Sequence, residues 1–267
     1  MPKETVFLKL GGSLITDKAR PRTARPETIR RLAEEIAQAR NVRPDIRLVL
    51  GHGSGSFGHT EAKKFGTAGG VRTADDWRGF TLVWAAADEL NRMVTDDLAA
   101  AGIPVVRIAP SSCAILEDGR LAEMPVAPVA SALDAGLVPV VYGDAVFDRT
   151  RGGGIASTEM VFAHLARSLH PQRILLAGIE RGVFEDFPAR KALLPRIRAG
   201  EWEQIRNRVE GSAHTDVTGG MFSKVEAMLD VVRRGENLAV LVFSGEGEGN
   251  LRRALVGENV EGTRLEK

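Results

Sequence analysis

Short apolar runs alternate with longer amphipathic segments along most of the chain. Runs rich in β-branched residues predict strands at 5–10, 46–50, 104–108, 138–142, 173–177 and 239–243. Apolar positions at helical spacing predict helices at 27–40, 76–101, 157–169 and 219–234. The strand runs are continuously apolar, which is typical of strands covered on both faces. The alternation therefore predicts an α/β fold with a mainly parallel central sheet.

The alternation breaks between residues 112 and 125. Two short runs there flank Asp118-Gly119, a pair typical of tight hairpin turns. We predict a β-hairpin that stands apart from the parallel sheet and lies over the substrate site. No repeat or low-complexity linker divides the chain, so we expect residues 1–267 to form a single domain with a soft internal boundary near 165–175.

Charge and cysteine content exclude several classes of protein. The net charge of +1 gives no basis for bulk binding to nucleic acid or to an anionic membrane. The single cysteine, Cys113, excludes internal disulfides and thiolate metal clusters and favours a reducing compartment. The N-terminus lacks a signal-peptide pattern, and no run reaches the ~18–20 apolar residues of a membrane span. We expect a cytoplasmic protein.

Two glycine-rich stretches directly follow predicted strands. Glycines at such positions let backbone N–H groups approach an anion without obstruction by side chains, so the pair indicates two phosphate sites. A tight turn beside solvated lysines is the alternative for the first stretch. The candidates are Lys9, Gly11, Gly12, Ser13 and Lys18 in KLGGSLITDK, and Gly53, Ser54, Gly55, Gly58 and His59 in GHGSGSFGH.

A third motif, DVTGGMFSK, spans Asp216 to Lys224. Gly219 and Gly220 come at the start of a predicted helix, whose N-terminal amides and dipole favour anions. Lys224 lies four residues after Gly220, on the same helical face. The spacing favours binding of a nucleotide phosphate over the alternative, a capped helix with a surface lysine.

A carboxylate and a histidine complete the candidate set. Asp144 follows the strand at 138–142, at the edge where open α/β sheets bind ligands, and there it can hold two lysines and help bind Mg²⁺ through water. Alone, it could equally be a turn residue. His59 has an unperturbed pKa of about 6.5, close to the second pKa of a phosphate monoester, so a charge-assisted hydrogen bond between them is favourable. Without the glycine stretch, a histidine bonded to a nearby carbonyl would be favoured.

These segments together resemble the amino acid kinase family, and the resemblance covers nearly the whole chain. It is carried by KLGGSLIT, HGSGSFGH, VYGD, DVTGGMxxKV and GTRL. It implies a three-layer αβα sandwich, ATP with Mg²⁺ as cofactors, a small-molecule acceptor and a homodimer. A histidine directly after SFG resembles the members that phosphorylate isopentenyl phosphate to the diphosphate by direct in-line transfer in isoprenoid biosynthesis.

The resemblance also implies a role for each candidate residue. His59 would bind the acceptor phosphate, Lys9 would stabilise the transferring group, and Asp144 would organise the lysines. The N-terminal half, about 1–170, would bind the acceptor and the C-terminal half, about 171–267, the nucleotide. Residues assigned to the nucleotide are Gly11, Gly12, Ser13, Lys18, Gly182, Asp216, Gly219, Gly220 and Lys224.

Three positions depart from the family pattern and leave the nucleotide contacts there open. Ile179 and Arg181 stand where carboxylates are common, and Glu159 stands where an aspartate is usual.

The acceptor tail needs an apolar wall. Phe80, Val83 and Trp84 lie at helical spacing near the second glycine stretch, a pattern more often found in a core than in a tail pocket. Isopentenyl and dimethylallyl phosphates do not differ in size, so we expect both to be accepted within about tenfold to a hundredfold of each other. Two alternatives stay open: a fosfomycin-type phosphonate kinase, and a nucleotide-binding regulatory or storage protein without turnover.

Overall fold

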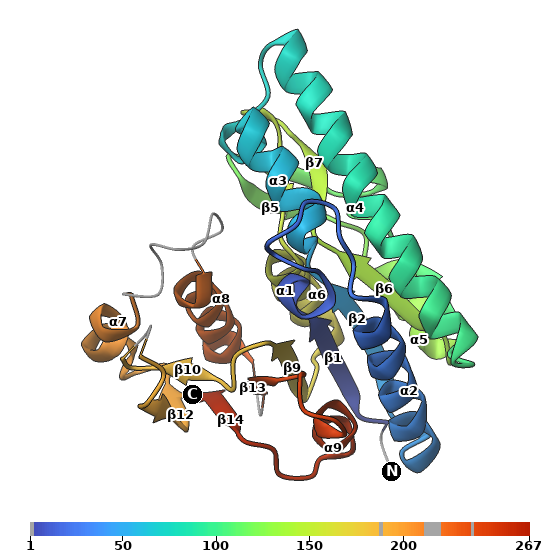
Figure 1. Ribbon diagram of the computed structural model, residues 1–267, viewed down its shortest axis with the longest axis vertical. Helices are drawn as coiled ribbons and strands as arrows, with labels where there is room; N and C mark the ends of the chain where they lie inside the picture. The colour runs from blue at the N-terminus through green and yellow to red at the C-terminus, as the bar shows by residue number, and fades with distance from the viewer. Residues whose placement is uncertain (1–2, 187–188, 211–219, 236–237) are drawn as a thin grey trace.

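The computed structural model describes residues 3–186, 189–210, 220–235 and 238–267 (Figure 1). Its centre is an eight-stranded sheet in the order β12-β14-β13-β9-β1-β2-β6-β3. Neighbouring strands are parallel except β13 and β14, so the predicted mainly parallel sheet is confirmed. The strands are β1 (Thr5–Leu10), β2 (Arg47–His52), β3 (Val105–Arg107), β6 (Val138–Tyr142), β9 (Arg173–Gly178), β12 (Arg196–Arg198), β13 (Ala239–Ser244) and β14 (Gly262–Glu266).

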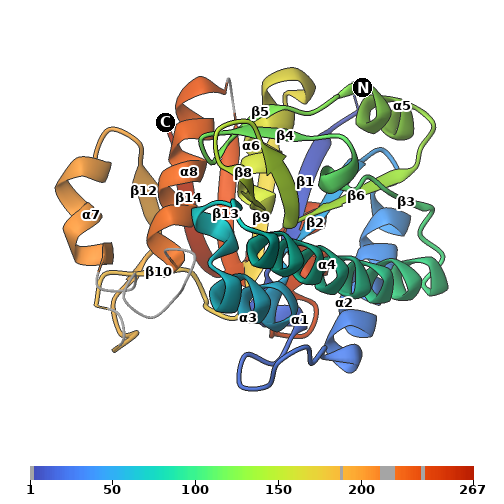
Figure 2. The same ribbon diagram turned by 90° about the horizontal axis from the view of Figure 1, so that it is seen from above.

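Helices cover both faces of this sheet, which gives the predicted three layers. The helices are α1 (Gly12–Ile15), α2 (Pro26–Val42), α3 (Gly55–Phe65), α4 (Ala74–Ala100), α5 (Ala127–Asp134), α6 (Thr158–Leu169), α7 (Trp202–Glu210), α8 (Gly220–Arg234) and α9 (Asn250–Val256). Figure 2 shows α1 to α4 on one side and α5, α6 and α8 on the other. Within the described ranges, no helix combines the length and the hydropathy that crossing a membrane requires.

Side-chain alternation along β1 divides the interior into two cores. Val6 and Leu8 pack with residues of α2, α4 and α9 on one face, while Phe7 packs with residues of α5, α6 and α8 on the other. The ring centroids of Phe7 and Phe162 lie 5.1 Å apart, which joins β1 to α6. Any residue of β1 two positions from Phe7 therefore faces α6 and α8.

A second, four-stranded sheet has the order β5-β4-β7-β8. The hairpin predicted around Asp118-Gly119 is confirmed as β4 (Ile115–Glu117) and β5 (Arg120–Glu123), and both turn residues have positive φ, 49° and 77°. The other hairpin, β7 (Asp144–Asp148) with β8 (Gly152–Ala156), packs against α4. β10 (Val183–Phe184) and β11 (Leu193–Leu194) form a separate two-stranded sheet that packs against β14.

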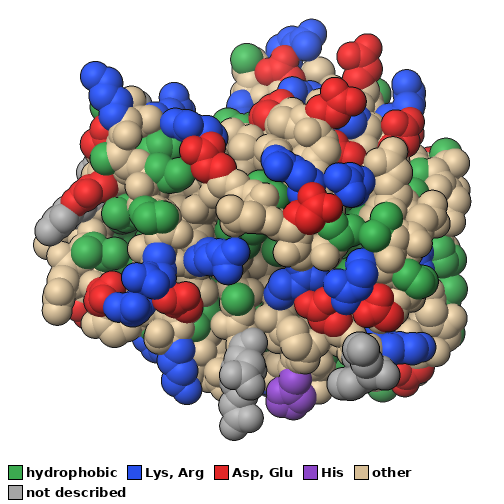
Figure 3. Space-filling model, turned by 90° about the horizontal axis from the view of Figure 1, so that it is seen from below, with side chains coloured by type: hydrophobic (Ala, Val, Ile, Leu, Met, Phe, Trp, Pro, Cys, Tyr) green, Lys and Arg blue, Asp and Glu red, His purple; other side chains and the backbone are tan. Residues whose placement is uncertain are grey.

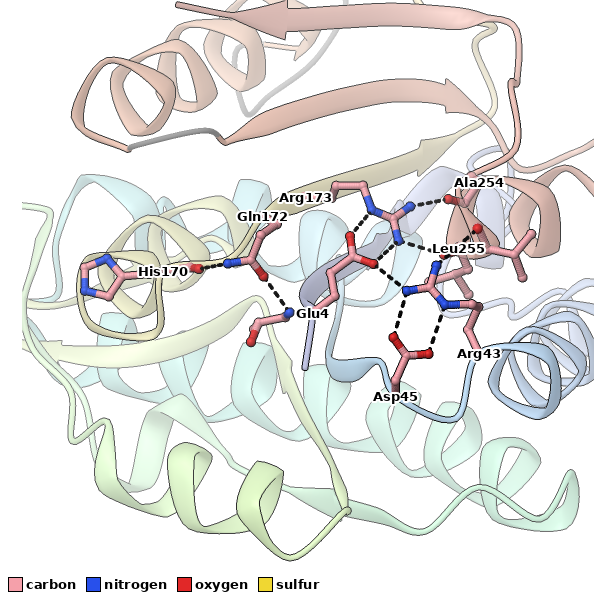
Figure 4. Close-up of polar contacts among 10 residues, drawn as sticks. Glu4, Arg43, Asp45, His170, Gln172, Arg173, Ala254 and Leu255 are labelled. Atoms are coloured by element: carbon pink, nitrogen blue, oxygen red, sulfur yellow. Dashed lines mark hydrogen bonds and ion pairs between the residues drawn. The ribbon is translucent and has the colours of Figure 1, made fainter. Parts of the chain in front are cut away.

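Helix α9 is held by opposite charges at its two ends. The buried carboxylate of Glu35 accepts hydrogen bonds from three backbone N–H groups at its start, at 3.0 and 3.1 Å. At the other end, Arg173 donates to two carbonyl oxygens of the last turn at 2.7 and 2.8 Å (Figure 4). An anion at the N-terminus and a cation at the C-terminus both complement the helix dipole. These bonds fix α9 against α2 and β9.

Candidate active site

Lys9 lies at the carboxyl end of β1, in the centre of the sheet. It is two positions from Phe7 and therefore faces α6 and α8. Its partner on the neighbouring strand is Gly51, and a Cβ there would come within 2.6 Å of the Thr158 side chain on α6. Glycine at this position lets α6 approach the sheet, which brings the first turn of that helix beside Lys9.

Lys9 pairs with a buried carboxylate at this point. Lys9 Nζ donates a hydrogen bond to Glu159 Oε1, and the two side chains are only 9% and 8% exposed. Burial raises the pKa of the Glu159 carboxyl, but the charges of Lys9 and Lys224 and the bond from Lys9 outweigh it and hold this pKa below its usual value. The carboxylate is therefore ionised at neutral pH and forms a buried ion pair with Lys9.

Glu159, and not Asp144, is thus the carboxylate to which Lys9 is seen to donate, while the organising role of Asp144 stays a prediction. Strand β6 of the central sheet ends at Tyr142, and Asp144 is the first residue of β7 in the second sheet. Its carboxylate accepts hydrogen bonds from the backbone N–H groups of Ser111 at 3.0 Å and Ala145 at 2.9 Å. Burial raises the pKa of Asp144 to about 6, more than these bonds lower it. Sequence analysis noted Glu159 only as a departure from the family pattern.

The two glycine-rich stretches interlock. A Cβ on Gly12 would lie 2.4 Å from the backbone nitrogen of Gly55, so neither stretch tolerates a side chain at their contact. The backbone at Gly55 has a positive φ of 48°, a conformation that favours glycine. Thr16 links the two stretches, because its hydroxyl donates to the Gly12 carbonyl at 2.7 Å and accepts from the Ser56 N–H at 3.0 Å. Sequence analysis missed Thr16, although it lies within the quoted KLGGSLIT segment.

The second glycine stretch continues directly into helix α3, which the periodicity did not predict. Ser54 is the N-cap, and a Cβ on Gly58 would come within 2.5 Å of its hydroxyl oxygen, so glycine at 58 makes room for this serine. His59 lies half-buried one turn into α3. The positive end of a helix and a histidine therefore lie together where the sequence predicted an acceptor phosphate.

Gly11, Ser13 and Lys18, three of the residues assigned to the nucleotide, follow the carboxyl end of β1. The N–H of Gly11 donates to the Ala177 carbonyl at 2.7 Å, which closes the turn after β1. Ser13 and Lys18 line a cavity of about 880 Å³ together with Ile179. The described residues also include Gly220, the first residue of α8, whose φ is +56°.

For three of the residues assigned to the nucleotide, the described part of the chain gives no sign of a nucleotide site. Gly182 is buried, and a Cβ there would lie 2.6 Å from the Thr263 hydroxyl, so close packing against β14 explains this glycine. Its contact with a nucleotide stays a prediction. Asp216 and Gly219 lie outside the described residues.

The predicted apolar wall divides into two parts. Phe80 and Val83 are buried, 6% and 3% exposed, and form a cluster with Val71 and Ala145. Trp84 is 44% exposed and lies outside this cluster, so it does not share the position of the other two. Because α3 packs along α4, the cluster lies beside the helix that carries His59.

The family model described as the amino acid kinase family matches residues 4–244. The chain belongs to the amino acid kinase family. It is 34% identical to the isopentenyl phosphate kinases of Methanothermobacter thermautotrophicus and Methanocaldococcus jannaschii, with 97% of this chain and 98% of each relative covered. A solved isopentenyl phosphate kinase structure superposes with a TM-score of 0.82 at 31% identity, covering 98% of this chain and 100% of that one. Membership confirms the fold and the family predicted from the sequence.

Proposed function

We propose that this protein is an isopentenyl phosphate kinase, which transfers the γ-phosphoryl group of ATP directly to the phosphate of isopentenyl phosphate and forms isopentenyl diphosphate. One observation supports the proposal: Lys9 pairs with the buried carboxylate of Glu159, which also feels the charge of Lys224, beside the interlocked glycine stretches that lead to His59. The names and the near full-length similarity of the relatives support the choice of acceptor.

Phosphoryl transfer between two phosphates depends mainly on positioning and charge neutralisation, because the attacking phosphate oxygen needs no strong base. In this proposal Lys9 stabilises the transferring group, and Lys18 and Lys224 contact the phosphates of ATP. Glu159 holds Lys9 at the end of β1 so that its ammonium group is already in place. His59 donates a hydrogen bond to the acceptor phosphate.

Magnesium fits this site as a companion of the nucleotide. In the described part of the chain, no three His, Cys, Asp or Glu side chains gather into a metal site. Mg²⁺ commonly binds through nucleotide phosphates, water and at most one or two carboxylates. We propose Asp144 as the residue that would contact it through water, and the ion would neutralise phosphate charge.

The buried cluster around Phe80 and Val83 offers an apolar wall for the isoprenoid tail. An apolar wall distinguishes substrates chiefly by size, so we propose that dimethylallyl phosphate is accepted as well.

We also propose that the protein is a cytoplasmic homodimer that pairs through helices of its N-terminal half. The exposed side chains of Trp84 and Met93 on α4, 44% and 38% exposed, support such a contact because large apolar side chains favour burial.

An assay of acceptor-dependent ADP release tests the proposed function. The panel contains isopentenyl phosphate, dimethylallyl phosphate, fosfomycin, glutamate and UMP, each with ATP and Mg²⁺. We expect the highest kcat/KM with isopentenyl phosphate and a value within about a hundredfold for dimethylallyl phosphate. Preference for fosfomycin would establish the phosphonate kinase instead. ATP binding without ADP release for any acceptor would support the regulatory or storage protein.

A further inference from the structure

His52 is the last residue of β2 and the second residue of the GHGSGSFGH stretch, and it is completely buried. Its ring stacks on Tyr142 with centroids 5.4 Å apart and planes inclined by 5°. Nε2 lies 2.9 Å from the amide nitrogen of Asn91 on α4, and Nδ1 lies 3.1 Å from the Gly53 carbonyl oxygen. Both ring nitrogens therefore have a hydrogen-bond partner.

These partners determine where the proton lies. A carbonyl oxygen can only accept, so Nδ1 must carry the hydrogen that points at Gly53, and a neutral ring then accepts at Nε2 from Asn91. Burial lowers the pKa of His52 to about 4; the bond to Gly53 opposes this and the charge of Lys9 adds to it. At neutral pH the ring is the uncharged Nδ1–H tautomer.

The bond from Nδ1 fixes the direction of one peptide group in the glycine stretch. In a trans peptide the C=O and the following N–H point in opposite directions. Because the Gly53 carbonyl points at the buried ring, the N–H of Ser54 points away from it. This N–H donates to no acceptor in the part of the chain that the structure describes. It is therefore available to an anion at the start of α3.

The flexibility of glycine makes this bond necessary. A glycine peptide can adopt more than one orientation at little cost, and the reverse orientation would point the Gly53 carbonyl outward, where it would repel a phosphate. The backbone carbonyl of His52 adds a second anchor. It accepts from the Thr158 hydroxyl at 2.6 Å, at the first residue of α6 and next to Glu159.

We propose that His52 is a positioning residue that holds the Gly53–Ser54 peptide so that the Ser54 N–H donates to the phosphate of the acceptor, with Asn91 fixing the required tautomer. This inference rests on the proposed function, because it assigns a further donor to the acceptor side of that site. His52 does not touch the substrate; it acts through the peptide group it orients.

Three variants and one control test the inference, each assayed for kcat and for the KM of isopentenyl phosphate and of ATP. His52→Leu removes both ring bonds, and Asn91→Leu removes only the donor to Nε2. His52→Asn keeps a short amide that can still donate to the Gly53 carbonyl. The control is His164→Leu on α6, which loses a comparable imidazole bond, to the Met124 carbonyl at 2.9 Å.

We expect His52→Leu to raise the KM of isopentenyl phosphate about 10- to 100-fold, the effect of losing a hydrogen bond to a charged group, with the KM of ATP unchanged. Asn91→Leu should raise it about three- to tenfold, because the tautomer is no longer fixed. His52→Asn should recover most of the loss, and His164→Leu should change neither KM.

An unchanged acceptor KM in His52→Leu would overturn the inference, and so would equal losses for ATP and acceptor with a lowered melting temperature, which indicate a general structural role. If His52→Leu does not fold, an unchanged acceptor KM in Asn91→Leu overturns it. The proposed function fails separately, when the unaltered protein releases no ADP in response to isopentenyl phosphate.

Discussion

Strand β1 has an ionic cluster at each end, and the two clusters differ in how deeply they are buried. At the amino end, Glu4 accepts from Arg173 at 2.5 Å and from Arg43 at 3.1 Å, and Asp45 accepts from Arg43 at 2.8 Å (Figure 4). Two carboxylates thus face two guanidinium groups. At the carboxyl end, Lys9 pairs with Glu159, whose carboxyl pKa is lowered by the charges of Lys9 and Lys224.

The two clusters also differ in their surroundings. Figure 3 shows the molecule from the amino end of β1, where basic and acidic side chains lie next to one another across the face. Lys9 and Glu159 instead form a buried pair, and buried charge is costly unless it is paired. In the proposed function, the carboxyl end of β1 is the end at which the phosphate groups bind.

The largest expected effect is that of Lys9→Met. Methionine keeps an apolar stem of similar length and removes the charge that faces the transferring group. We expect kcat/KM for isopentenyl phosphate to fall by about 10³-fold, the cost of removing one principal transition-state donor. Steady-state ADP release measures this.

The matched control is Lys63→Met on α3, which removes an exposed lysine that the proposal gives no role. It should leave kcat/KM within about twofold, as expected of a surface substitution. Equal losses in the two variants would mean that bulk positive charge, and not the position of Lys9, supports activity.

Glu159→Gln should have the next largest effect. The amide can still accept a hydrogen bond from Lys9, but the negative charge that attracts Lys9 and Lys224 is gone. We expect kcat to fall by about 10- to 100-fold, the usual cost of a small misplacement of a catalytic group. Glu159→Asp retains the charge and should retain more activity. The assignment of Glu159 as organiser is refuted if Glu159→Gln turns over at the rate of the unaltered protein.

Glu4→Ala should lower the stability of the protein and leave its activity unchanged. Removal of its carboxylate leaves Arg43 and Arg173 short of a partner, so we expect a loss of about 1–3 kcal/mol in the free energy of unfolding, measured in urea. The kcat/KM should not change, because this cluster lies at the far end of β1. A large change in kcat/KM with unaltered stability would break the comparison between the two ends.

Asp144→Asn should change the pH dependence of stability. The folded pKa of Asp144 is about 6 against an ordinary 3.8, so between these values the folded protein binds more protons than the unfolded chain, and this residue loses stabilising effect as the pH rises. The variant should be more stable than the parent at pH 7 by at most about 3 kcal/mol, and this advantage should vanish near pH 4. The same difference at both pH values would contradict the raised pKa.

His52 changes the stability with pH in the opposite direction to Asp144. Its folded pKa of about 4 lies below the ordinary 6.5, so the unfolded chain binds more protons between these values and stability falls as the pH falls. In the parent protein the two contributions oppose one another in this range. The Asp144→Asn variant should therefore lose stability more steeply below pH 6 than the parent.

Strands and one hairpin were predictable because their signals are local. Continuous apolar runs identify β1 and β2, and Asp118-Gly119 identifies a tight turn. Helix α3 was not predictable from periodicity, since glycine and small polar residues occupy its first turn and packing on α4 stabilises it. The chemistry of the glycine stretches was predictable from composition, but their contact at Gly12 and Gly55 was not.

The organising carboxylate shows most clearly where sequence reasoning stops. The pairing of Lys9 with Glu159 joins residues 150 positions apart and requires α6 to approach Gly51 closely. Asp144 has the right residue type at the right edge, yet the chain turns into the second sheet just before it. Only the packing of α6 on the sheet brings Glu159 to Lys9, and sequence alone does not give that packing.

The most direct test of the central claim is the kinetics of His59→Ala with isopentenyl phosphate and ATP. If His59 binds the phosphate that accepts the transferred group, kcat/KM for isopentenyl phosphate falls by about 10- to 100-fold or more, while the affinity for ATP is kept. Unchanged kinetics for isopentenyl phosphate would remove His59 from the site and contradict the account of a phosphate acceptor held at the start of α3.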